Sequence, residues 1–175
     1  MPVTGRWTHF LDTPLGVLEA AFDAKGRLKL LSFTPDLDRA AEPRPEPPHV
    51  TQSFAFLGHQ LDAYFKGQLR TFTVPLDPDG SAFQQRVWGM LLQVPYGKTT
   101  TYADLARHLG DPKLTRAVGG ANGHNPIPIL IPCHRVVGAD GSLTGYGGGL
   151  DKKEFLLRLE GVLGAGTPRL LDTDP

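Results

Sequence analysis

Residues 125–137 read Asn125-Pro126-Ile127-Pro128-Ile129-Leu130-Ile131-Pro132-Cys133-His134-Arg135-Val136-Val137. The stretch holds the only cysteine of the 175-residue chain, and a histidine follows it directly. Each proline pushes the residue before it toward extended backbone, so this apolar run predicts a rigid, strand-like segment that stops where Cys133 begins. The cysteine is therefore expected at a fixed, buried break in the fold.

Cys133 is a candidate nucleophile. A thiol with a pKa of about 8.5 is only a few per cent ionised at neutral pH, so it needs help to react as a thiolate. Pro132 can begin a helical turn, which would bring unpaired backbone N–H groups near the thiol and favour its thiolate. His134 is the adjacent candidate base, although adjacency alone gives no direct contact and a bridging water would serve. The alternative is a small buried hydrophobic residue beside a surface histidine.

Composition is that of an ordinary globular protein, with 40% hydrophobic and 21% charged residues and a net charge of zero. This length supports one good core or two small ones. One cysteine forms no internal disulfide, no apolar run approaches the roughly 18 residues of a membrane span, and residues 1–6 lack the apolar region of a signal peptide. A reducing, cytoplasmic location without membrane contact is expected.

Charge is distributed unevenly along the chain. Residues 81–150 carry 6 Lys and Arg against 3 Asp and Glu, whereas residues 1–80 carry 8 against 10 and residues 151–175 carry 4 against 5. The basic surplus around Cys133 is small, so it permits nucleic-acid binding without requiring it.

The first third of the chain reads as short strands. Three β-compatible runs separated by turn sequences predict an antiparallel meander over residues 4–10, 17–22 and 28–33. The proline-rich residues 40–48 are typical of a semi-rigid, extended surface loop.

A helix and one more strand are expected next. Apolar residues recur at helical spacing up to Phe65, and Gly67 stops the helix. Residues 71–76 look like a further strand. The turn-rich residues 77–80 then mark a boundary, so residues 1–80 are expected to form an α/β domain with a small antiparallel sheet and a helix.

The second half reads as helical. Ser81 and Gln84 have the spacing of a capping box that opens a helix ending before Pro95, and Trp88 is expected in its packed core. Thr101 caps the next short helix. Gly110 turns the chain, and Asp111-Pro112 begins another helix, which gives helix-turn-helix spacing. Helical hairpins that do not bind DNA share this spacing.

The second helix of this pair, residues 113–122, contains the adjacent glycines Gly119 and Gly120. Each costs about 0.8 to 1 kcal/mol relative to alanine in a helix interior. Their presence indicates close approach to this backbone, either by a neighbouring helix of the same chain or by an external partner.

Two segments after the cysteine complete the candidate site. A turn at residues 138–141 leads to a glycine-rich loop, residues 143–150, around Tyr146, which suits folding over a small ligand. Residues 151–154 are expected to cap a last helix that ends at Gly161. Glu160 lies in its final turn, where a carboxylate opposes the helix dipole, so either a special partner or simple surface exposure is expected.

Together these motifs closely resemble the O6-alkylguanine-DNA alkyltransferase family over about residues 81–161. The resemblance rests on Pro-Cys-His-Arg-Val at 132–136, on the proline run before it and on Gly-Tyr-Gly-Gly-Gly-Leu at 145–150. It implies a ribonuclease H-like α/β domain over residues 1–80, then a mostly helical, winged helix-turn-helix-like domain over residues 81–165 and a tail, residues 166–175.

The resemblance also implies the reaction and its residues. One alkyl group would pass irreversibly from O6 of guanine, or O4 of thymine, in DNA to the cysteine. The implied catalytic residues are Cys133, His134, Glu160 and Tyr102. The implied DNA contacts are Thr115, Arg116, Ala117, Gly120, Ala121, Asn122 and Arg135. The implied pocket residues are Tyr102, Asn125, Val136, Tyr146, Gly147 and Gly148.

Individual roles follow from the same resemblance. Tyr102 would give a proton to guanine O6, His134 would be held by Glu160, and Arg116 would fill the space left by an extruded base. Asn125 would tie the recognition helix to the active-site segment. Some relatives carry a pocket serine where this chain has Gly147, so that hydroxyl contact must come from a backbone N–H or be absent.

The partner implied is double-stranded DNA bound through the minor groove, by a monomer without a cofactor. No Cys-x-x-Cys or His/Cys cluster suggests a metal.

Three alternative functions stay open. A non-catalytic damage sensor would replace the reactive cysteine with tryptophan, a Cys-His-Glu hydrolase would turn over, and a transcription regulator would survive loss of Cys133.

Overall fold

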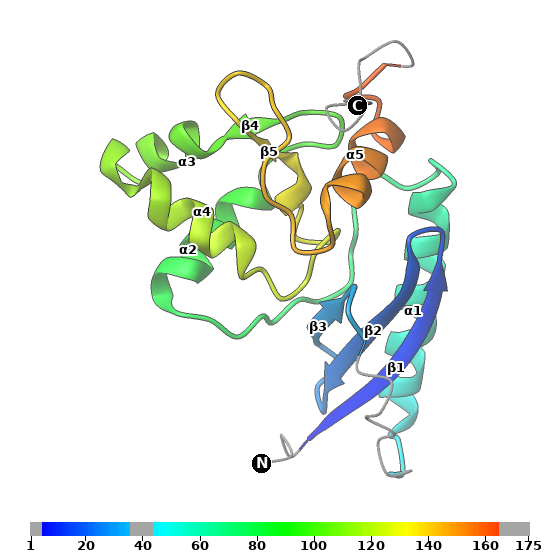
Figure 1. Cartoon of the computed structure of the whole chain (residues 1–175). Helices are drawn as coiled ribbons and strands as arrows, with labels where there is room; N and C mark the ends of the chain where they lie inside the picture. The colour runs from blue at the N-terminus through cyan, green and yellow to red at the C-terminus, as the bar shows by residue number, and fades with distance from the viewer. Residues whose placement is uncertain (1–4, 36–43, 165–175) are drawn as a thin grey trace. The chain divides into compact units, whose positions relative to one another are not determined.

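The structure is a computed structural model that describes residues 5–35 and 44–164. The chain divides into two compact units, an N-terminal unit, Met1–Asp79, and a C-terminal unit, Gly80–Pro175. The first combines an antiparallel sheet with a helix and the second is mostly helical, which confirms the expected fold class (Figure 1). Residues 40–43 of the proline-rich loop and the expected tail, residues 166–175, lie outside the described residues.

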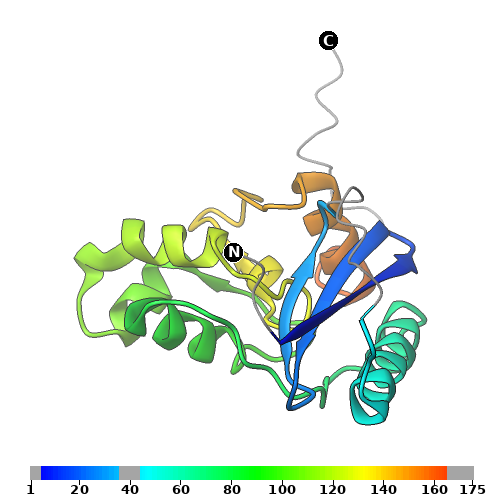
Figure 2. The same cartoon turned by 90° about the horizontal axis from the view of Figure 1, so that it is seen from below.

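The N-terminal unit is built on three strands, β1 (Arg6–Thr13), β2 (Gly16–Asp23) and β3 (Leu28–Ser32). They pair antiparallel in the order β1-β2-β3, so the predicted meander is confirmed. Helix α1 (Pro48–Phe65) lies along one face of this sheet (Figure 2). The core of the unit consists of apolar side chains from the sheet and the helix, including Leu18, Phe22, Leu28, Leu31, Val50, Phe54, Leu57 and Leu61.

The prediction of a strand over residues 71–76 is wrong. This segment pairs with β3 only through one bridge, Leu28 to Leu76. Leu28 N–H donates to the Pro75 carbonyl at 2.8 Å, but Pro75 has no N–H with which to extend a ladder. The Gln60 side chain instead holds Thr73, accepting from its backbone N–H and donating to its hydroxyl. Side-chain clamping to α1 therefore replaces strand pairing.

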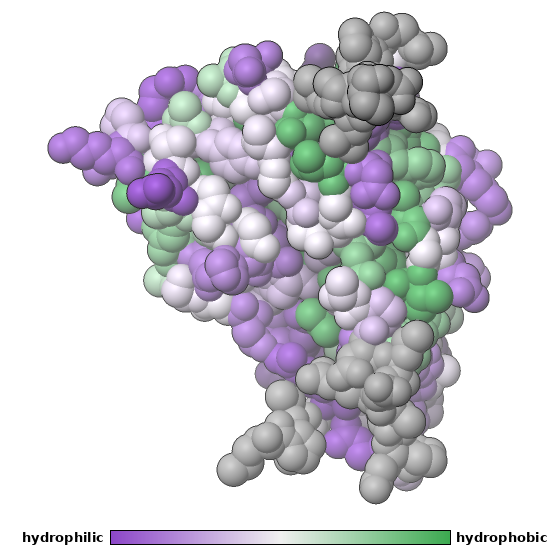
Figure 3. Space-filling model, in the orientation of Figure 1, coloured by the Kyte–Doolittle hydropathy of each residue, from purple (hydrophilic) through white to green (hydrophobic). Residues whose placement is uncertain are grey.

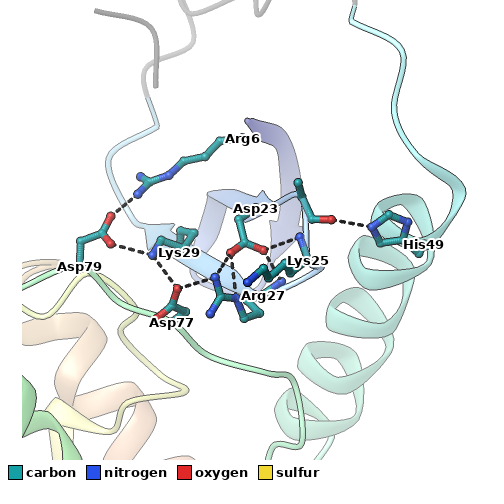
Figure 4. Close-up of polar contacts among 9 residues, drawn as sticks. Arg6, Asp23, Lys25, Arg27, Lys29, His49, Asp77 and Asp79 are labelled. Atoms are coloured by element: carbon teal, nitrogen blue, oxygen red, sulfur yellow. Dashed lines mark hydrogen bonds and ion pairs between the residues drawn. The ribbon is translucent and has the colours of Figure 1, made fainter. Parts of the chain in front are cut away.

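An ion-pair cluster fastens the end of this unit to its sheet (Figure 4). The ammonium of Lys29 lies 2.9 Å from Asp77 and 2.6 Å from Asp79, and Arg6 also pairs with Asp79. Arg27 pairs with Asp77 at 3.1 Å. The cluster thus joins β1 and β3 to the last residues of the unit.

The C-terminal unit begins with α2 (Ala82–Leu91), whose Ser81–Gln84 capping box is formed as predicted. Trp88 is 2% exposed and donates its indole N–H to the Ala121 carbonyl at 2.9 Å, so its expected core position is confirmed. The remaining elements are β4 (Thr100–Thr101), α3 (Tyr102–His108), η1 (Pro112–Leu114), α4 (Thr115–Gly123), η2 (Cys133–Arg135), β5 (Val136–Val137) and α5 (Leu150–Leu159).

Two helix starts differ from expectation. The Asp111 side chain accepts from Lys113 N–H, which tightens the first turn into the 3-10 helix η1, so α4 begins at Thr115 and not at Lys113. Helix α5 has Gly149, at φ 100°, as its N-cap and no side-chain cap. The cap expected from residues 151–154 is therefore wrong, because the helix already includes them.

The segment before Cys133 is also not strand-like. Ile131 N–H donates to the Ile127 carbonyl at 2.9 Å, which closes a turn, and Ile129 adopts φ 75°. The prolines restrict their neighbours, but the Asn125 side chain bonds to both ends of the turn and curls it. The expected burial is confirmed, since Ile127, Ile129 and Ile131 are at most 1% exposed.

In the described part of the chain, no helix has the length and apolar character needed to cross a membrane.

Candidate active site

Cys133 lies in the first turn after the buried Ile-rich segment, at the start of η2, and is 4% exposed. Asn125 donates from its amide to the Ile131 carbonyl at 2.8 Å and accepts from Ile127 N–H at 3.0 Å. From α4, the Asn122 amide donates to the Cys133 carbonyl at 3.5 Å. The backbone around the thiol is therefore held from both sides, and the direct link from α4 comes from Asn122.

Burial is the dominant electrostatic influence on the thiol. It raises the pKa of Cys133 to about 11, against the lowering effects of a hydrogen bond from the Asn125 side chain and of the Lys153 charge. Backbone N–H groups of Cys133 and His134 also lower this pKa, so the turn favours the thiolate as expected, but burial outweighs them. Loss of hydration penalises the charged form more than these hydrogen bonds favour it, so the resting thiol is protonated.

The base expected beside the cysteine has a carboxylate partner. His134 Nε2 lies 2.8 Å from Glu160 Oε1, and both side chains are completely buried. Because a carboxylate only accepts, Nε2 carries the proton and Nδ1 presents a lone pair in the neutral ring. Nδ1 is buried and has no hydrogen-bond partner in the described residues. The alternative of Glu160 as a surface residue is excluded.

Arg135 was expected to contact DNA, but its side chain is buried and bound within the protein. Its guanidinium turns inward and binds Glu160 through two N–H groups, at 2.9 Å and 3.0 Å, and donates to the Val94 carbonyl at 2.6 Å. Only 7% of the residue is exposed. Glu160 is thus shared between His134 and Arg135. The sequence does not show this arrangement, because Glu160 lies 25 residues beyond Arg135.

This sharing decides the protonation state of the histidine. Burial lowers the pKa of His134, and the positive charges of Arg135 and Lys153 act in the same direction, together outweighing the hydrogen bond and charge of Glu160. The ring is therefore neutral at physiological pH and can accept a proton at Nδ1.

Parallel pairing of β4 with β5 brings the start of α3 beside the cysteine segment. The Tyr102 hydroxyl consequently reaches the glycine-rich loop and donates to the Thr144 carbonyl at 2.9 Å. In the same loop, Tyr146 is half-buried, and a Cβ added to Gly147 would meet no atom within 4 Å. Packing therefore does not demand glycine at position 147.

Lys153 was missed as a site residue and interpreted only as part of a helix cap. It is fully buried, and its ammonium donates to the carbonyls of Val136, Thr144 and Gly145 at 2.6, 2.9 and 3.4 Å. Helical spacing contained the signal, because position 153 shares a face with the buried Leu156, Leu157 and Glu160.

Helix α4 presents only part of the expected DNA contacts to solvent. Arg116, Ala117 and Gly120 are exposed and Thr115 is half-buried, but Ala121 and Asn122 are each 4% exposed and face the core. Assigning DNA contacts to those two residues is therefore wrong for this structure. Their positions follow from the 3.6-residue period, which turns them inward together with Val118.

The glycines of α4 are not explained by packing within the chain. A Cβ at Gly120 would meet nothing within 4 Å, and one at Gly119 would meet only the Tyr102 ring at 3.9 Å, an ordinary contact. The alternative of tight packing against a neighbouring helix is therefore wrong.

Across residues 5–35 and 44–164, no group of three or more His, Cys, Asp and Glu side chains could hold a metal ion. The groups of the site that are chemically suited to proton or group transfer are the Cys133 thiol, the His134–Glu160 pair and the Tyr102 hydroxyl. Fold and site together define a two-unit protein whose mostly helical unit holds a buried thiol next in the chain to a buried His134–Glu160 pair.

Comparison with known proteins identifies the family. Residues 7–78 match the family described as 6-O-methylguanine DNA methyltransferase, ribonuclease-like domain, and residues 82–162 match 6-O-methylguanine DNA methyltransferase, DNA binding domain. The chain therefore belongs to the O6-methylguanine DNA methyltransferase family, which confirms the resemblance read from its motifs.

Individual relatives are similar over most of their length. The methylated-DNA–protein-cysteine methyltransferase of Methanosarcina acetivorans is 47% identical over 86% of this chain and 95% of its own. That of Mycolicibacterium paratuberculosis is 49% identical over 86% and 89%. The Mycobacterium tuberculosis O6-methylguanine methyltransferase structure aligns with a TM-score of 0.74 and 44% identity, covering 91% and 96%. A structure of Mycobacterium tuberculosis OGT in complex with DNA aligns with a TM-score of 0.76 and 45% identity, covering 87% and 91%.

Proposed function

We propose that this chain repairs O6-methylguanine in DNA by moving the methyl group to Cys133. The sulfur attacks the methyl carbon, the carbon–oxygen bond breaks, and its electron pair passes to the guanine. The thiol proton leaves through His134, and the Tyr102 hydroxyl protonates the departing base. Guanine is restored, and the protein keeps a thioether, which is a poor leaving group, so each chain acts once.

The observation that carries this proposal is the buried pair of His134 and Glu160 beside the only thiol. Nδ1 of His134 is buried without a partner in the described residues, so a water bridging it to the thiol would satisfy both groups. Proton transfer along this route generates the thiolate for the reaction. A thiol with its pKa raised to about 11 is otherwise protected from unspecific alkylation.

We further infer that double-stranded DNA binds through its minor groove against α4. The relative from Mycobacterium tuberculosis was solved with DNA, and α4 exposes Arg116, Ala117 and Gly120. Hydrophilic side chains gather over the turn that joins α3 to α4 (Figure 3). The target base must leave the stack at a cost of a few kcal/mol, and Arg116 would fill its place.

The protein is proposed to act as a cytoplasmic monomer, because a reducing compartment keeps the single thiol available. No cofactor takes part in the proposed reaction.

Peptide mapping tests the reaction directly. After incubation with a duplex that contains O6-methylguanine, Cys133 should gain about 14 Da, with at most one event per chain, and Cys133→Ser should gain none. The alkyl mass and the disappearance of O6-methylguanine should be equal in amount. Repeated turnover would favour a hydrolase that uses the same three residues, and transfer at the normal rate by Cys133→Ser would contradict the proposal.

A further inference from the structure

The proposed reaction gives no role to Lys153, a completely buried charge. Lys153 is 0% exposed, and a fully buried lysine is rare unless it is paired. In the described part of the chain, no carboxylate forms an ion pair with it. Its three hydrogen bonds all go to backbone carbonyls, those of Val136, Thr144 and Gly145. An ammonium has three donors, so the set of acceptors is complete.

These carbonyls belong to the parts of the chain that surround the proposed pocket. Val136 begins β5 directly after the cysteine turn, and Thr144 and Gly145 begin the loop that carries Tyr146. The Thr144 carbonyl also accepts the hydroxyl of Tyr102, at the same distance of 2.9 Å as it accepts Lys153. One carbonyl therefore joins the lysine to the proposed proton donor.

The same ammonium acts on the nucleophile. Its charge lowers the pKa of Cys133 and that of His134, so both groups of η2 sense it. In return, a Cys133 thiolate raises the pKa of Lys153, which burial lowers to about 8. The other ionisable groups nearby are the Arg135–Glu160 pair, which is internally balanced, and Tyr102 across the loop.

We propose that Lys153 is a positioning residue for methyl transfer, whose buried ammonium holds the Thr144 carbonyl that accepts the Tyr102 hydroxyl and stabilises the Cys133 thiolate as it forms. This inference rests on the proposed function. A carbonyl cage can orient an ammonium, but it leaves the positive charge unneutralised, and the developing thiolate neutralises it during the reaction.

Lys153→Met tests the role of the charge, with Lys152→Met as its matched control. Methionine has a similar length without charge, and Lys152 is the preceding residue of α5 but is only half-buried and takes no part in the carbonyl cage. With saturating duplex at pH 7, the limiting transfer rate should fall about tenfold in Lys153→Met, equivalent to a shift of one pKa unit. The half-saturating DNA concentration should stay within about twofold. Lys152→Met should keep the wild-type limiting rate.

A second readout needs no DNA. At pH 7, below the pKa of Lys153, alkylation of Cys133 by iodoacetamide follows the thiolate fraction, so Lys153→Met should react about tenfold more slowly than wild type or Lys152→Met. This arm stands even if the wild type transfers no methyl group from DNA, an outcome that would contradict the proposed function alone. Equal iodoacetamide rates in the two variants would overturn the role of the charge.

The link through Thr144 is tested by combining Lys153→Met with Tyr102→Phe. If the lysine orients the tyrosine, the double variant should lose less rate than the product of the two single losses. Fully multiplicative losses would overturn this link.

If Lys153→Met fails to fold, Lys153→Gln replaces it throughout, because an amide keeps two donors for the carbonyls and removes the charge. A normal iodoacetamide rate in Lys153→Gln would then reject the proposal.

Discussion

At the scale of single residues, the shared carboxylate of Glu160 decides how basic His134 is. One oxygen accepts from the imidazole at 2.8 Å, while Arg135 binds both oxygens. The guanidinium competes with the imidazole for the carboxylate, and its positive charge also disfavours the protonated, positively charged form of His134. Glu160 therefore supports His134 as a base, and Arg135 limits that support.

Substitutions of Glu160 and of Arg135 are expected to shift the pH midpoint of methyl transfer in opposite directions. Glu160→Gln should move the pH midpoint of methyl transfer upward and slow the reaction at neutral pH by roughly 10² to 10⁴-fold, because a less basic His134 stabilises the thiolate less. Arg135→Met should move the midpoint downward, because it removes a charge that lowers the pKa of His134. Transfer rates measured against pH on folded protein check both directions.

Thermal stability alone cannot identify this role. Both substitutions break a buried ion pair and leave one charge unpaired, which typically costs 3–5 kcal/mol, so both should lower the melting temperature. Midpoints that stay unchanged in both variants would remove the His134–Glu160 pair from the mechanism.

At the scale of elements, α4 combines poor helix formers with an open face. Among the described residues, no atom lies within 4 Å of a Cβ added to Gly120, so this glycine is unfavourable for the helix and unnecessary for packing there. The remaining reason for a small residue is the approach of something outside the chain, which in the proposed function is the DNA backbone.

Gly120→Ala should therefore stabilise the protein by about 0.5–1 kcal/mol and at the same time slow repair of duplex DNA. Gly58→Ala is the matched control, because Gly58 lies in α1 and its added Cβ would also meet nothing within 4 Å. That variant should gain similar stability with unchanged repair. Thermal melts and transfer rates on duplex substrate measure the two effects.

Free O6-benzylguanine separates DNA contact from damage to the site. Gly120→Ala should react with this free base at the wild-type rate, and so should Arg116→Ala, which is expected to slow only duplex repair. A Gly120→Ala variant that repairs duplex normally would show that α4 does not approach DNA closely.

At the scale of the whole molecule, charge clusters make the fold sensitive to acid. Hydrogen bonds from Lys29 and then Arg6 lower the pKa of Asp79, despite its partial burial. Because this pKa is lower in the folded than in the unfolded state, the carboxylate stabilises the fold above about pH 4, its unfolded value. The stabilisation is lost as the pH falls through the lower folded value.

Asp79→Asn should consequently lower the melting temperature at pH 7, and the difference from wild type should disappear in acid. Its side chain is 65% exposed, so the effect is on the order of 1 kcal/mol, or about 2–4 °C. Asp62→Asn is the control, since Asp62 is equally exposed but, within residues 5–35 and 44–164, forms its ion pair with Lys66 of its own helix. A loss at pH 7 no larger than that of the control would contradict a stabilising cluster.

Local rules in the sequence were sufficient for most of the elements. The meander, the Ser81–Gln84 capping box, the Thr101 cap and the buried position of Trp88 all depend on residues close in the chain or on simple apolar periodicity. The same holds for the candidate nucleophile, because it is the only thiol present. Failures occurred where side chains overrode backbone preference, as with Gln60 at residues 71–76 and Asn125 before the cysteine.

The sequence by itself therefore determined the two-part architecture, the family and the residue types of the site. Only the tertiary structure decided their states: a thiol protonated through burial, an arginine turned inward to Glu160, and a lysine held by three carbonyls. The physical reason is that pKa values and ion pairs depend on hydration and on neighbours from distant segments, such as Cys133 and Glu160. Helix caps and periodicity depend on contacts within a few residues, which a sequence displays directly.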